Sequence, residues 1–292
     1  MKWLVRDLFT TQIRKTTITD MNKKLLLTDL DDTLLTSKKE VSATDRNSIE
    51  KMITAGHKFA IATGRPFFSA RLIAQELELC KPGVFIISSN GGAIYDCGRD
   101  LMLHKGSVPF GLVEYMFGEA AKSQLHIHTY TDTHVVCLKE TPELLMYTKT
   151  IKMPYKILEK IPEDLPYEPP KMIVMSIKDN SREILTEFKD RIYPSIEGKL
   201  NPVFSNKALL EFLPPDSSKG AALVKLCNSL GIPVADSIAC GDEENDISMI
   251  KAAGVGVAMK NGTDSAKACA DYITTCTNNE NAITEAINKF VF

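Results

Sequence analysis

Two aspartates follow a short apolar run near the start of the chain. The run from Leu25 to Thr28 predicts a buried strand, and Asp29 and Asp31 come directly after it, two positions apart. One such carboxylate can attack phosphorus and bind a hard cation, while the second moves a proton. Aspartates at this place can also simply cap the next turn, so the segment by itself leaves both interpretations open.

Two later segments place polar groups where predicted elements begin or end. Thr63, Gly64 and Arg65 follow an apolar run, and a hydroxyl beside exposed backbone N–H groups can bind phosphate oxygens. The alternative for this segment is an ordinary strand-to-helix turn capped by Thr63. Lys219 begins a predicted helix, where a lysine opposes the helix dipole. A bound phosphate would offset this mismatch, and a solvated lysine is the alternative.

The segment Gly241-Asp242-Glu243-Glu244-Asn245-Asp246 is strongly acidic. Four acids in five residues repel one another unless a cation or a lysine lies among them. Magnesium prefers oxygen ligands and keeps some of its water, so such a loop suits it. An acidic helix N-terminus accounts for part of this charge but not readily for all of it.

The order of these segments is more specific than any one of them. The chain presents a DxDxT pair, a Thr-Gly, a Lys and a GDxxND, and this set resembles the haloacid dehalogenase (HAD) superfamily of phosphotransferases. The residues that match the family pattern one by one are Asp29, Asp31, Thr63, Lys219, Asp242 and Asp246. An acid at position 31 is similar to the phosphatase and mutase branches. Further segments resemble the Cof-type sugar-phosphatase subfamily, namely Ser89–Ala93, Leu210–Pro214, Gly254–Met259 and Ala270–Tyr272.

The resemblance implies a magnesium-dependent phosphomonoester hydrolase that acts on small phosphorylated metabolites, with sugar phosphates as the family expectation. It implies Asp29 as the nucleophile that becomes an aspartyl-phosphate and Asp31 as the general acid and base. The residues expected to bind phosphate are Thr63, Gly64, Lys219 and Asn245. The groups expected around Mg2+ are the Asp29 carboxylate, the Asp31 backbone carbonyl and the Asp242 carboxylate, with Asp246 orienting them. The residues expected on the substrate or cap side are Arg65, Asn90 and Gly91.

Two rival functions share these motifs. A phosphomutase would pass the phosphoryl group from Asp29 to a second substrate hydroxyl instead of to water. A sugar-phosphate sensor would keep the fold without chemistry, but a mere binder needs neither an attacking carboxylate nor an acid at Asp31.

The elements at both ends of the chain alternate between apolar runs and amphipathic stretches, which predicts an α/β fold. Repeated strand–helix units indicate a Rossmann-like parallel sheet with both faces covered. The predicted strands are Lys24–Thr28, Lys58–Ala62, Val84–Ser88, Ser237–Cys240 and Val255–Met259. The predicted helices are Ser42–Ala55, Pro66–Leu79, Ser218–Leu230, Asn245–Ala253 and Asn281–Lys289.

The middle of the chain predicts an inserted α+β cap domain. Its predicted helices are Phe110–Ser123, Pro142–Ile151 and Arg182–Arg191, and its predicted strands are His126–Tyr130, His134–Leu138, Met172–Ile177 and Pro202–Phe204. Ligands of open parallel sheets bind beyond the carboxyl ends of the strands, so an insertion there would cover the site and select substrates. The expected division is a non-core extension at 1–20, a catalytic core at 21–91 and 206–292, and a cap at 92–205.

The composition limits which classes of partner and which cellular compartment are expected. The chain has 292 residues, with 35 Lys plus Arg against 37 Asp plus Glu, so no strong field attracts nucleic acid or an anionic membrane. No apolar run approaches the roughly 20 residues of a membrane span. The seven cysteines contain no CxxC pair and predict reduced thiols in a cytoplasmic protein. The expected partner is a small phosphate ester, and the expected assembly is a monomer or a small homo-oligomer.

Two features stay open at this point. Residues 1–20 are interpreted as an extension, with a docking helix or a targeting peptide as alternatives. His126 and His128 share one strand face, with His134 across a turn. This triplet allows a metal site, while ordinary polar residues on a strand face are the favoured interpretation.

Overall fold

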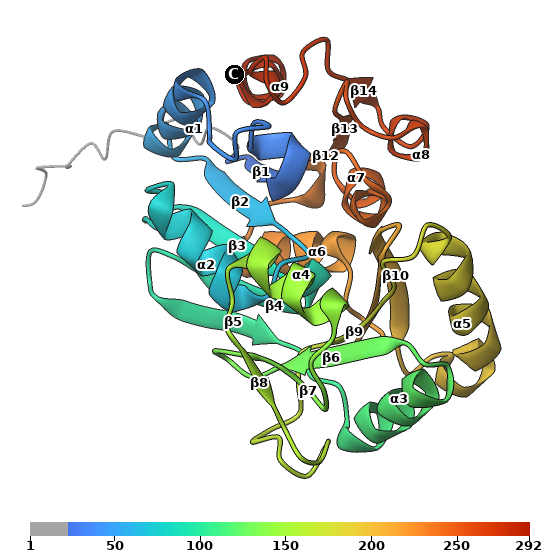
Figure 1. Cartoon of the computed structure of the whole chain (residues 1–292). Coiled ribbons are helices and arrows are strands. Elements are labelled where there is room, and N and C mark those ends of the chain that lie inside the picture. Colours follow the sequence, from blue (N-terminus) through green and yellow to red (C-terminus); the bar gives the residue numbers. More distant parts are fainter. Residues whose placement is uncertain (1–22) are drawn as a thin grey trace, which may run out of the picture.

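The structure is a computed structural model in which residues 23–292 are described (Figure 1). The predicted extension at 1–20 and its two alternatives lie outside the described residues. Figure 1 shows two layered bodies, one built from both ends of the described chain and one from its middle. The predicted α/β core with an inserted α+β domain is confirmed.

The larger body is built on an eight-stranded sheet of the described residues, in the order β14-β13-β12-β1-β2-β3-β4-β5. All pairs from β14 to β3 are parallel, and β4 and β5 add an antiparallel edge. The strands are β1 (Leu25–Thr28), β2 (Lys58–Ala62), β3 (Val84–Ser88), β4 (Ala93–Asp96), β5 (Leu101–Lys105), β12 (Ser237–Gly241), β13 (Val255–Ala258) and β14 (Tyr272–Ile273). The first strand is central, which is why its apolar run is buried on both faces.

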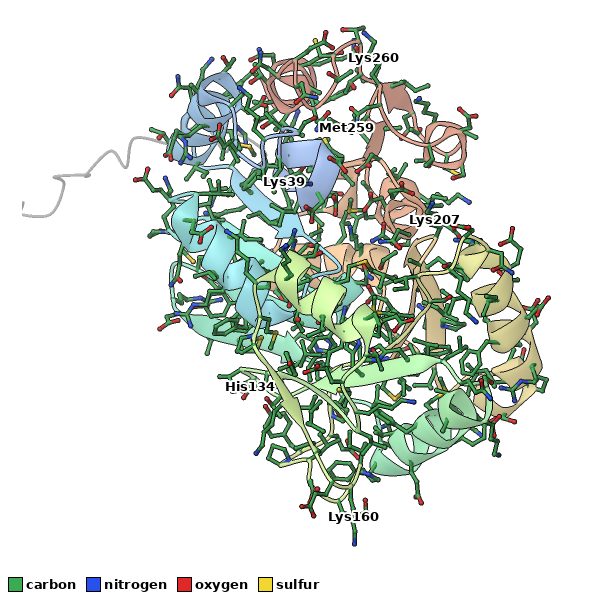
Figure 2. All side chains as sticks on the ribbon, viewed as in Figure 1. Lys39, His134, Lys160, Lys207, Met259 and Lys260 are labelled. Atoms are coloured by element: carbon green, nitrogen blue, oxygen red, sulfur yellow. The ribbon has the colours of Figure 1, made fainter. Side chains whose placement is uncertain are left out.

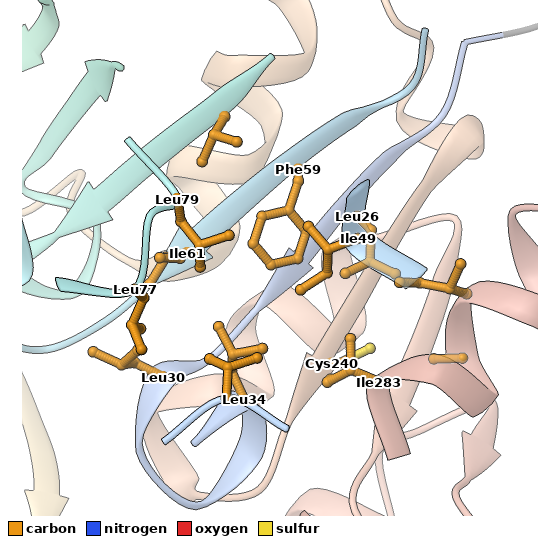
Figure 3. Close-up of a cluster of buried hydrophobic side chains, with 14 of the residues drawn as sticks. Leu26, Leu30, Leu34, Ile49, Phe59, Ile61, Leu77, Leu79, Cys240 and Ile283 are labelled. Carbon is orange, nitrogen blue, oxygen red and sulfur yellow. The ribbon is translucent and has the colours of Figure 1, made fainter. Parts of the chain in front are cut away.

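Helices cover both faces of this sheet. One face packs on α1 (Ala43–Thr54), α2 (Phe67–Glu76) and α9 (Ala282–Phe290), and the other on α6 (Lys219–Leu230) and α7 (Ile247–Ala252). Figure 3 shows the first of these two clusters, in which Phe59 lies among Leu26, Ile49 and Ile61. The remaining short elements of the core are η1 (Leu30–Leu34), η2 (Ser89–Gly91), η3 (Val234–Asp236), η4 (Glu244–Asp246) and α8 (Asp264–Lys267).

The smaller body is a six-stranded sheet of the described residues, in the order β10-β11-β9-β6-β7-β8. Its strands are β6 (His126–Tyr130), β7 (Val135–Cys137), β8 (Tyr155–Ile157), β9 (Met172–Met175), β10 (Asn201–Asn206) and β11 (Leu209–Leu213). One face packs on α3 (Phe110–Lys122) and α5 (Ser181–Ile196), and the other on α4 (Pro142–Ile151). Figure 1 shows α4 between this sheet and the core.

The chain passes between the two sheets at other positions than the domain boundaries expected at residues 92 and 206. The hairpin of β4 and β5 extends the core sheet by pairing with β3, although it lies beyond residue 92. The strand β11 pairs with β9 and β10 in the second sheet, although it lies beyond residue 206. The strands β4 and β5 follow β3 in consecutive hairpins, and β11 follows β10 in another, so each sheet extends through its hairpins past the expected boundary. An apolar run alone does not tell which sheet it joins.

Two predicted elements are longer or more broken than expected. The helix expected at Arg182–Arg191 runs from Ser181 to Ile196 and includes Pro194. The helix expected at Asn245–Ala253 is divided into η4 and α7 at Asp246. Among the described residues, no helix is both long and apolar enough to cross a membrane.

The buried Phe59 offers a test of the core packing. Its side chain is fully buried, so Phe59→Ala removes a ring and leaves a cavity between the sheet and α1. We expect the free energy of unfolding to fall by about 3–5 kcal/mol, measured from urea unfolding followed by circular dichroism. The control Phe110→Ala alters a phenylalanine that is 36% exposed and should cost about 1.5 kcal/mol or less. Equal losses would contradict this packing.

Candidate active site

The strand ends bring the predicted site residues to one edge of the core sheet. The first strand lies between β2 and β12, and all three run parallel. Asp29, Thr63 and Asp242 follow the last residues of these strands, so the three side chains start from the same edge. This is the edge at which open parallel sheets bind ligands.

A buried lysine connects two of the aspartates. The Nζ atom of Lys219 lies 2.5 Å from Asp29 Oδ1 and 2.5 Å from Asp246 Oδ1, and its side chain is fully buried. Burial lowers the pKa of Lys219, but the carboxylates of Asp246 and Asp29 outweigh burial and raise it. The ammonium therefore stays charged and serves as a fixed positive group beside Asp29.

Two glycines make room for this ion-pair network. A Cβ at Gly220 would lie 2.2 Å from the backbone oxygen of Ser248, and a Cβ at Gly241 would lie 2.4 Å from Asp246 Cβ. Only glycine therefore allows α6 to approach α7 so closely at Gly220, and allows the end of β12 to approach Asp246 at Gly241. Ser218 begins α6 by accepting a hydrogen bond from Ala221 N, which places Lys219 in the first turn.

One positive charge does not balance the three carboxylates. Oxygens of Asp29, Asp242 and Asp246 lie within 4.8 Å of one another. Burial raises the pKa of Asp29, with Lys219 opposing and the other two carboxylates adding to the rise. Burial and Asp246 raise the pKa of Asp242 to about 7, although a hydrogen bond from Thr33 Oγ1 at 2.6 Å opposes the rise. A divalent cation would relieve this repulsion, and an all-oxygen donor set suits a hard ion such as Mg2+.

The three carboxylates are not equally free to bind a cation. Asp246 Oδ1 accepts from Lys219, and its Oδ2 accepts from the backbone N–H groups of Asp242 and Glu243 at 3.0 and 3.1 Å. Asp29 and Asp242 each keep one carboxylate oxygen without a hydrogen bond to another described residue. The geometry therefore suits Asp29 and Asp242 as direct ligands, with Asp246 holding the loop and Lys219 in place.

Arg65 holds Asp31 in a two-point ion pair. Its Nε and Nη2 atoms lie 2.8 and 3.0 Å from the two carboxylate oxygens, and Lys39 Nζ lies 3.2 Å from one of them. Figure 2 labels Lys39, which approaches from the loop beyond η1. Burial raises the pKa of Asp31, but Arg65 and then Lys39 outweigh it and lower the pKa. Arg65 also donates to Thr150 O of the cap at 3.5 Å, so it connects the acid to α4.

The asparagines predicted at the site form a connected pair. Asn245 Nδ2 donates to Asn90 Oδ1 at 3.0 Å, and Asn90 Nδ2 donates to Ser205 Oγ of the cap at 3.2 Å. Thr63 Oγ1 accepts from Arg65 N at 3.1 Å. The Gly64 N–H makes no hydrogen bond to another described residue, so it is available to an anion.

A cavity of about 340 Å3 lies over these groups, between the core and the cap. From the core it is lined by Asp29, Asp31, Asp32, Thr63, Gly64, Arg65, Asp242, Glu243 and Asn245. From the cap it is lined by Met146, Tyr147, Thr150, Ile151, Met175, Ser205, Asn206, Ala208, Leu209 and Glu211. The core side is acidic and polar, while the cap side mixes apolar and polar groups.

Asn90 and Gly91, expected on the substrate side, lie behind this lining. Gly91 has φ +98°, and a Cβ there would lie 2.1 Å from Ser218 O. Its role is therefore to let η2 pass over the start of α6, which carries Lys219. Asn90 contacts the cavity only through Asn245 and Ser205. Close backbone approach explains the glycine at position 91, whereas the Asn90 side chain connects Asn245 of the core to Ser205 of the cap.

Sequence reasoning missed a buried ion pair in the cap. Lys171 Nζ lies 2.7 Å from Glu211 Oε2 and donates to Gly64 O at 2.6 Å, so this ion pair holds the cap to the loop that follows β2. Each partner stands beside apolar residues of a strand, and the two are 40 positions apart in the chain. No local pattern signals such a pair. Thr33 was also missed, although it is the last residue of the DxDxT pattern.

The histidine triplet does not come together as a metal site. His126 and His128 are buried and hydrogen-bonded to each other, whereas His134 pairs with Thr133 at the turn. Among the described residues, the group of metal-binding side chains is the aspartate cluster. The favoured interpretation as ordinary polar residues was also incomplete, because His126 and His128 are interior.

Comparison with known proteins agrees with this site. The family model of haloacid dehalogenase-like hydrolases matches residues 26–287. The chain belongs to this family. It is 30% identical over 272 residues to the 5-amino-6-(5-phospho-D-ribitylamino)uracil phosphatase YcsE of Bacillus subtilis (strain 168), covering 93% of this chain and 97% of the relative. It is 27% identical over 238 residues to an HMP-PP phosphatase of Yersinia pseudotuberculosis serotype I (strain IP32953), covering 82% of this chain and 84% of the relative.

A solved structure agrees in fold. The haloacid dehalogenase-like hydrolase from Bacteroides thetaiotaomicron superposes with a TM-score of 0.82 at 31% identity, covering 92% of this chain and all of that one. The predicted resemblance to the HAD superfamily and its Cof-type phosphatases is confirmed. The chain is a hydrolase of phosphoric monoesters.

The raised pKa of Asp242 predicts how a cation changes stability. The folded state binds this proton more tightly than the unfolded chain does. The stabilisation by protonated Asp242 is therefore complete below about pH 4, falls as pH rises, and is lost above about pH 7. In chelator, we expect the Tm to fall over this window. Mg2+ should raise the Tm at about pH 8 by ~2 °C or more, because it neutralises the carboxylate.

The variant Asp242→Asn tests this expectation by scanning calorimetry. It should flatten the pH dependence in chelator and lose most of the increase caused by Mg2+. The control Asp179→Asn, at an exposed cap position, should behave as the wild type. An undiminished Mg2+ effect in Asp242→Asn would show that the cation binds elsewhere.

Proposed function

We propose that the protein is a magnesium-dependent phosphatase that hydrolyses sugar phosphates and related small esters through an aspartyl-phosphate on Asp29. The observation that carries this proposal is the position of Asp29. It lies at the cavity, is held by the buried Lys219 ammonium, and stands beside two further carboxylates that call for a cation.

Asp29 is suited to attack phosphorus. Its Oδ1 is engaged by Lys219, and its other oxygen has no partner among the described residues. A carboxylate and a phosphate dianion repel one another, so attack requires positive charge on both sides of the reacting atoms. Lys219 supplies one such charge. Mg2+, held by Asp29, the Asp31 carbonyl and Asp242, would supply the other when bound.

Asp31 is suited to move the proton. In the first step, a bond forms between Asp29 and phosphorus, the bond to the leaving oxygen breaks, and Asp31 donates a proton to that oxygen. Because Arg65 and Lys39 lower the pKa of Asp31, Asp31 carries this proton only after substrate binding has loosened its ion pair with Arg65. In the second step, Asp31 takes a proton from water, whose oxygen attacks phosphorus and releases the Asp29 carboxylate. Arg65 keeps Asp31 at the cavity wall between turnovers.

The phosphate oxygens face four groups of the core. Thr63 and Asn245 line the cavity, the Gly64 N–H is unengaged by any residue from 23 to 292, and Lys219 lies beside Asp29. Together these groups would hold the phosphoryl group in line with Asp29, while Asp246 keeps Lys219 and the acidic loop in place.

The proposal includes a cytoplasmic enzyme with a small-molecule partner. All seven cysteines, which lie within the described residues, are free thiols, and Cys80 and Cys97 approach to 3.6 Å without forming a disulfide. Reduced thiols in proximity are typical of a reducing compartment.

Replacing the nucleophile tests the chemistry directly. Asp29→Asn keeps the shape of the side chain but removes the attacking charge, so we expect kcat for p-nitrophenyl phosphate with Mg2+ to fall by at least about a thousandfold. The exposed control Asp190→Asn should keep its activity. Circular dichroism checks that both variants are folded. Full activity in Asp29→Asn would refute the assignment, and an inactive wild type would favour the sensor alternative.

Labelled water separates hydrolysis from phosphoryl transfer to another alcohol. With water enriched in heavy oxygen, each released phosphate should carry about one labelled oxygen, because water attacks the aspartyl-phosphate at phosphorus. Mass spectrometry of the released phosphate gives this number. A phosphorylated second substrate without label in free phosphate would indicate the mutase instead.

A further inference from the structure

A chain of hydrogen bonds crosses the cap and ends at the cavity. Thr141 Oγ1 lies 2.9 Å from His126 Nδ1, and His126 Nε2 lies 3.0 Å from His128 Nδ1. His128 Nε2 then lies 3.1 Å from Tyr130 Oη, which lies 2.5 Å from Tyr147 Oη. Tyr147 lines the cavity above Asp29. We call these five side chains the cap chain.

The two imidazoles of the cap chain are neutral. Burial lowers the pKa of His126 to about 4, with Glu143 opposing the shift, and burial lowers the pKa of His128 well below its usual range. A neutral imidazole has one N–H donor and one acceptor nitrogen. Both nitrogens of both rings are engaged, so the bonds from Thr141 to Tyr130 must point in the same direction. In the last bond, between Tyr130 and Tyr147, either hydroxyl can be the donor when Tyr130 accepts from His128.

Either direction leaves the Tyr147 hydroxyl with one unused hydrogen-bonding capacity, as a donor or as an acceptor. If the bonds run from Thr141 toward the cavity and Tyr130 donates, the Tyr147 hydroxyl accepts and its own proton points onward. If Tyr147 donates to Tyr130, as it must when the bonds run the other way, a lone pair is left. Tyr130 is its hydrogen-bond partner among the described residues, and no second one is formed.

Two charged side chains of the cavity, Glu211 and Arg65, influence the Tyr147 hydroxyl. Burial raises the pKa of Tyr147, the Glu211 carboxylate adds to the rise, and Arg65 opposes it, so both charges act on the hydroxyl. Both also line the cavity. The ring is held against His128, with centroids 4.5 Å apart. Glu211 is already engaged by Lys171 and Ser205, which leaves Tyr147 as a hydroxyl on the cap side with unused capacity.

We propose that Tyr147 is a specificity-determining residue whose hydroxyl hydrogen-bonds an alcohol hydroxyl of the leaving group, and that His126, His128 and Tyr130 are positioning residues behind it. This inference rests on the proposed phosphatase function. An alcohol both donates and accepts, so it fits either direction of the cap chain. A carboxylate or an ammonium fits only one.

Substrate discrimination tests the proposal. The measured quantity is the ratio of kcat/KM for D-ribitol 5-phosphate to kcat/KM for phenyl phosphate, whose leaving group has no further hydroxyl. Tyr147→Phe should lower this ratio about tenfold, through KM more than kcat, because one hydrogen bond to the leaving group is lost. Tyr130→Phe keeps the Tyr147 hydroxyl but removes the hydrogen bond that orients it. This variant should therefore lower the ratio by less, about threefold.

The matched control is Tyr193→Phe, which removes a hydroxyl from an exposed tyrosine of α5 that does not line the cavity. Its ratio should match the wild type. If Tyr147→Phe changes kcat/KM for both esters by the same factor, the hydroxyl acts on folding or on phosphate binding, and the proposal is overturned.

Binding without turnover separates this inference from the proposed function. In the Asp29→Asn protein, calorimetry gives the Kd of D-ribitol 5-phosphate and of inorganic phosphate, with and without Tyr147→Phe. We expect a Kd about tenfold higher for the ester and a change below about twofold for phosphate. The absence of any difference between the two proteins overturns the role of Tyr147. Failure of the wild type to hydrolyse either ester counts against the phosphatase function alone.

Discussion

The buried ion pair of Lys219 with Asp29 and Asp246 is the interaction on which the rest of the site depends. A lysine without exposure is tolerated only when carboxylates hold its charge, and here two do so at 2.5 Å. The same contacts orient Asp29, the proposed nucleophile, fix the acidic loop and leave an excess of negative charge that a cation can neutralise. Fold stability and chemistry therefore share one set of residues.

The cap is tied to this centre by polar contacts rather than by sheet pairing. Lys171 reaches Gly64 O, Arg65 reaches Thr150 O, and Asn90 reaches Ser205. Each contact ends on a core residue that lines the cavity or supports it. A shift of the cap would therefore disturb the core loops that line the cavity. In the proposed function, this coupling lets a separate domain select the leaving group while the core performs the reaction.

Parts of the fold were predictable because their signals are local. The run before Asp29 is apolar because β1 is central, and Ser42 and Ser218 cap their helices as their residue types suggest. The sheet membership of β4, β5 and β11 was not predictable in this way. The hairpin of β4 and β5 follows β3 directly, but an apolar run does not show which sheet it extends. The strand β11 joins the second sheet through β9, more than thirty positions earlier.

The sequence by itself determined the type and order of the groups around Asp29, because chemistry of this kind needs particular residues directly after particular strands. It did not reveal that Asn90 and Gly91 stand behind the cavity, that Lys171 pairs with Glu211, or that His126 and His128 lead to Tyr147. Only the tertiary structure decided these relations. Such contacts depend on which side chains meet when the elements of the two sheets pack together. The spacing of residues along the chain does not specify these meetings.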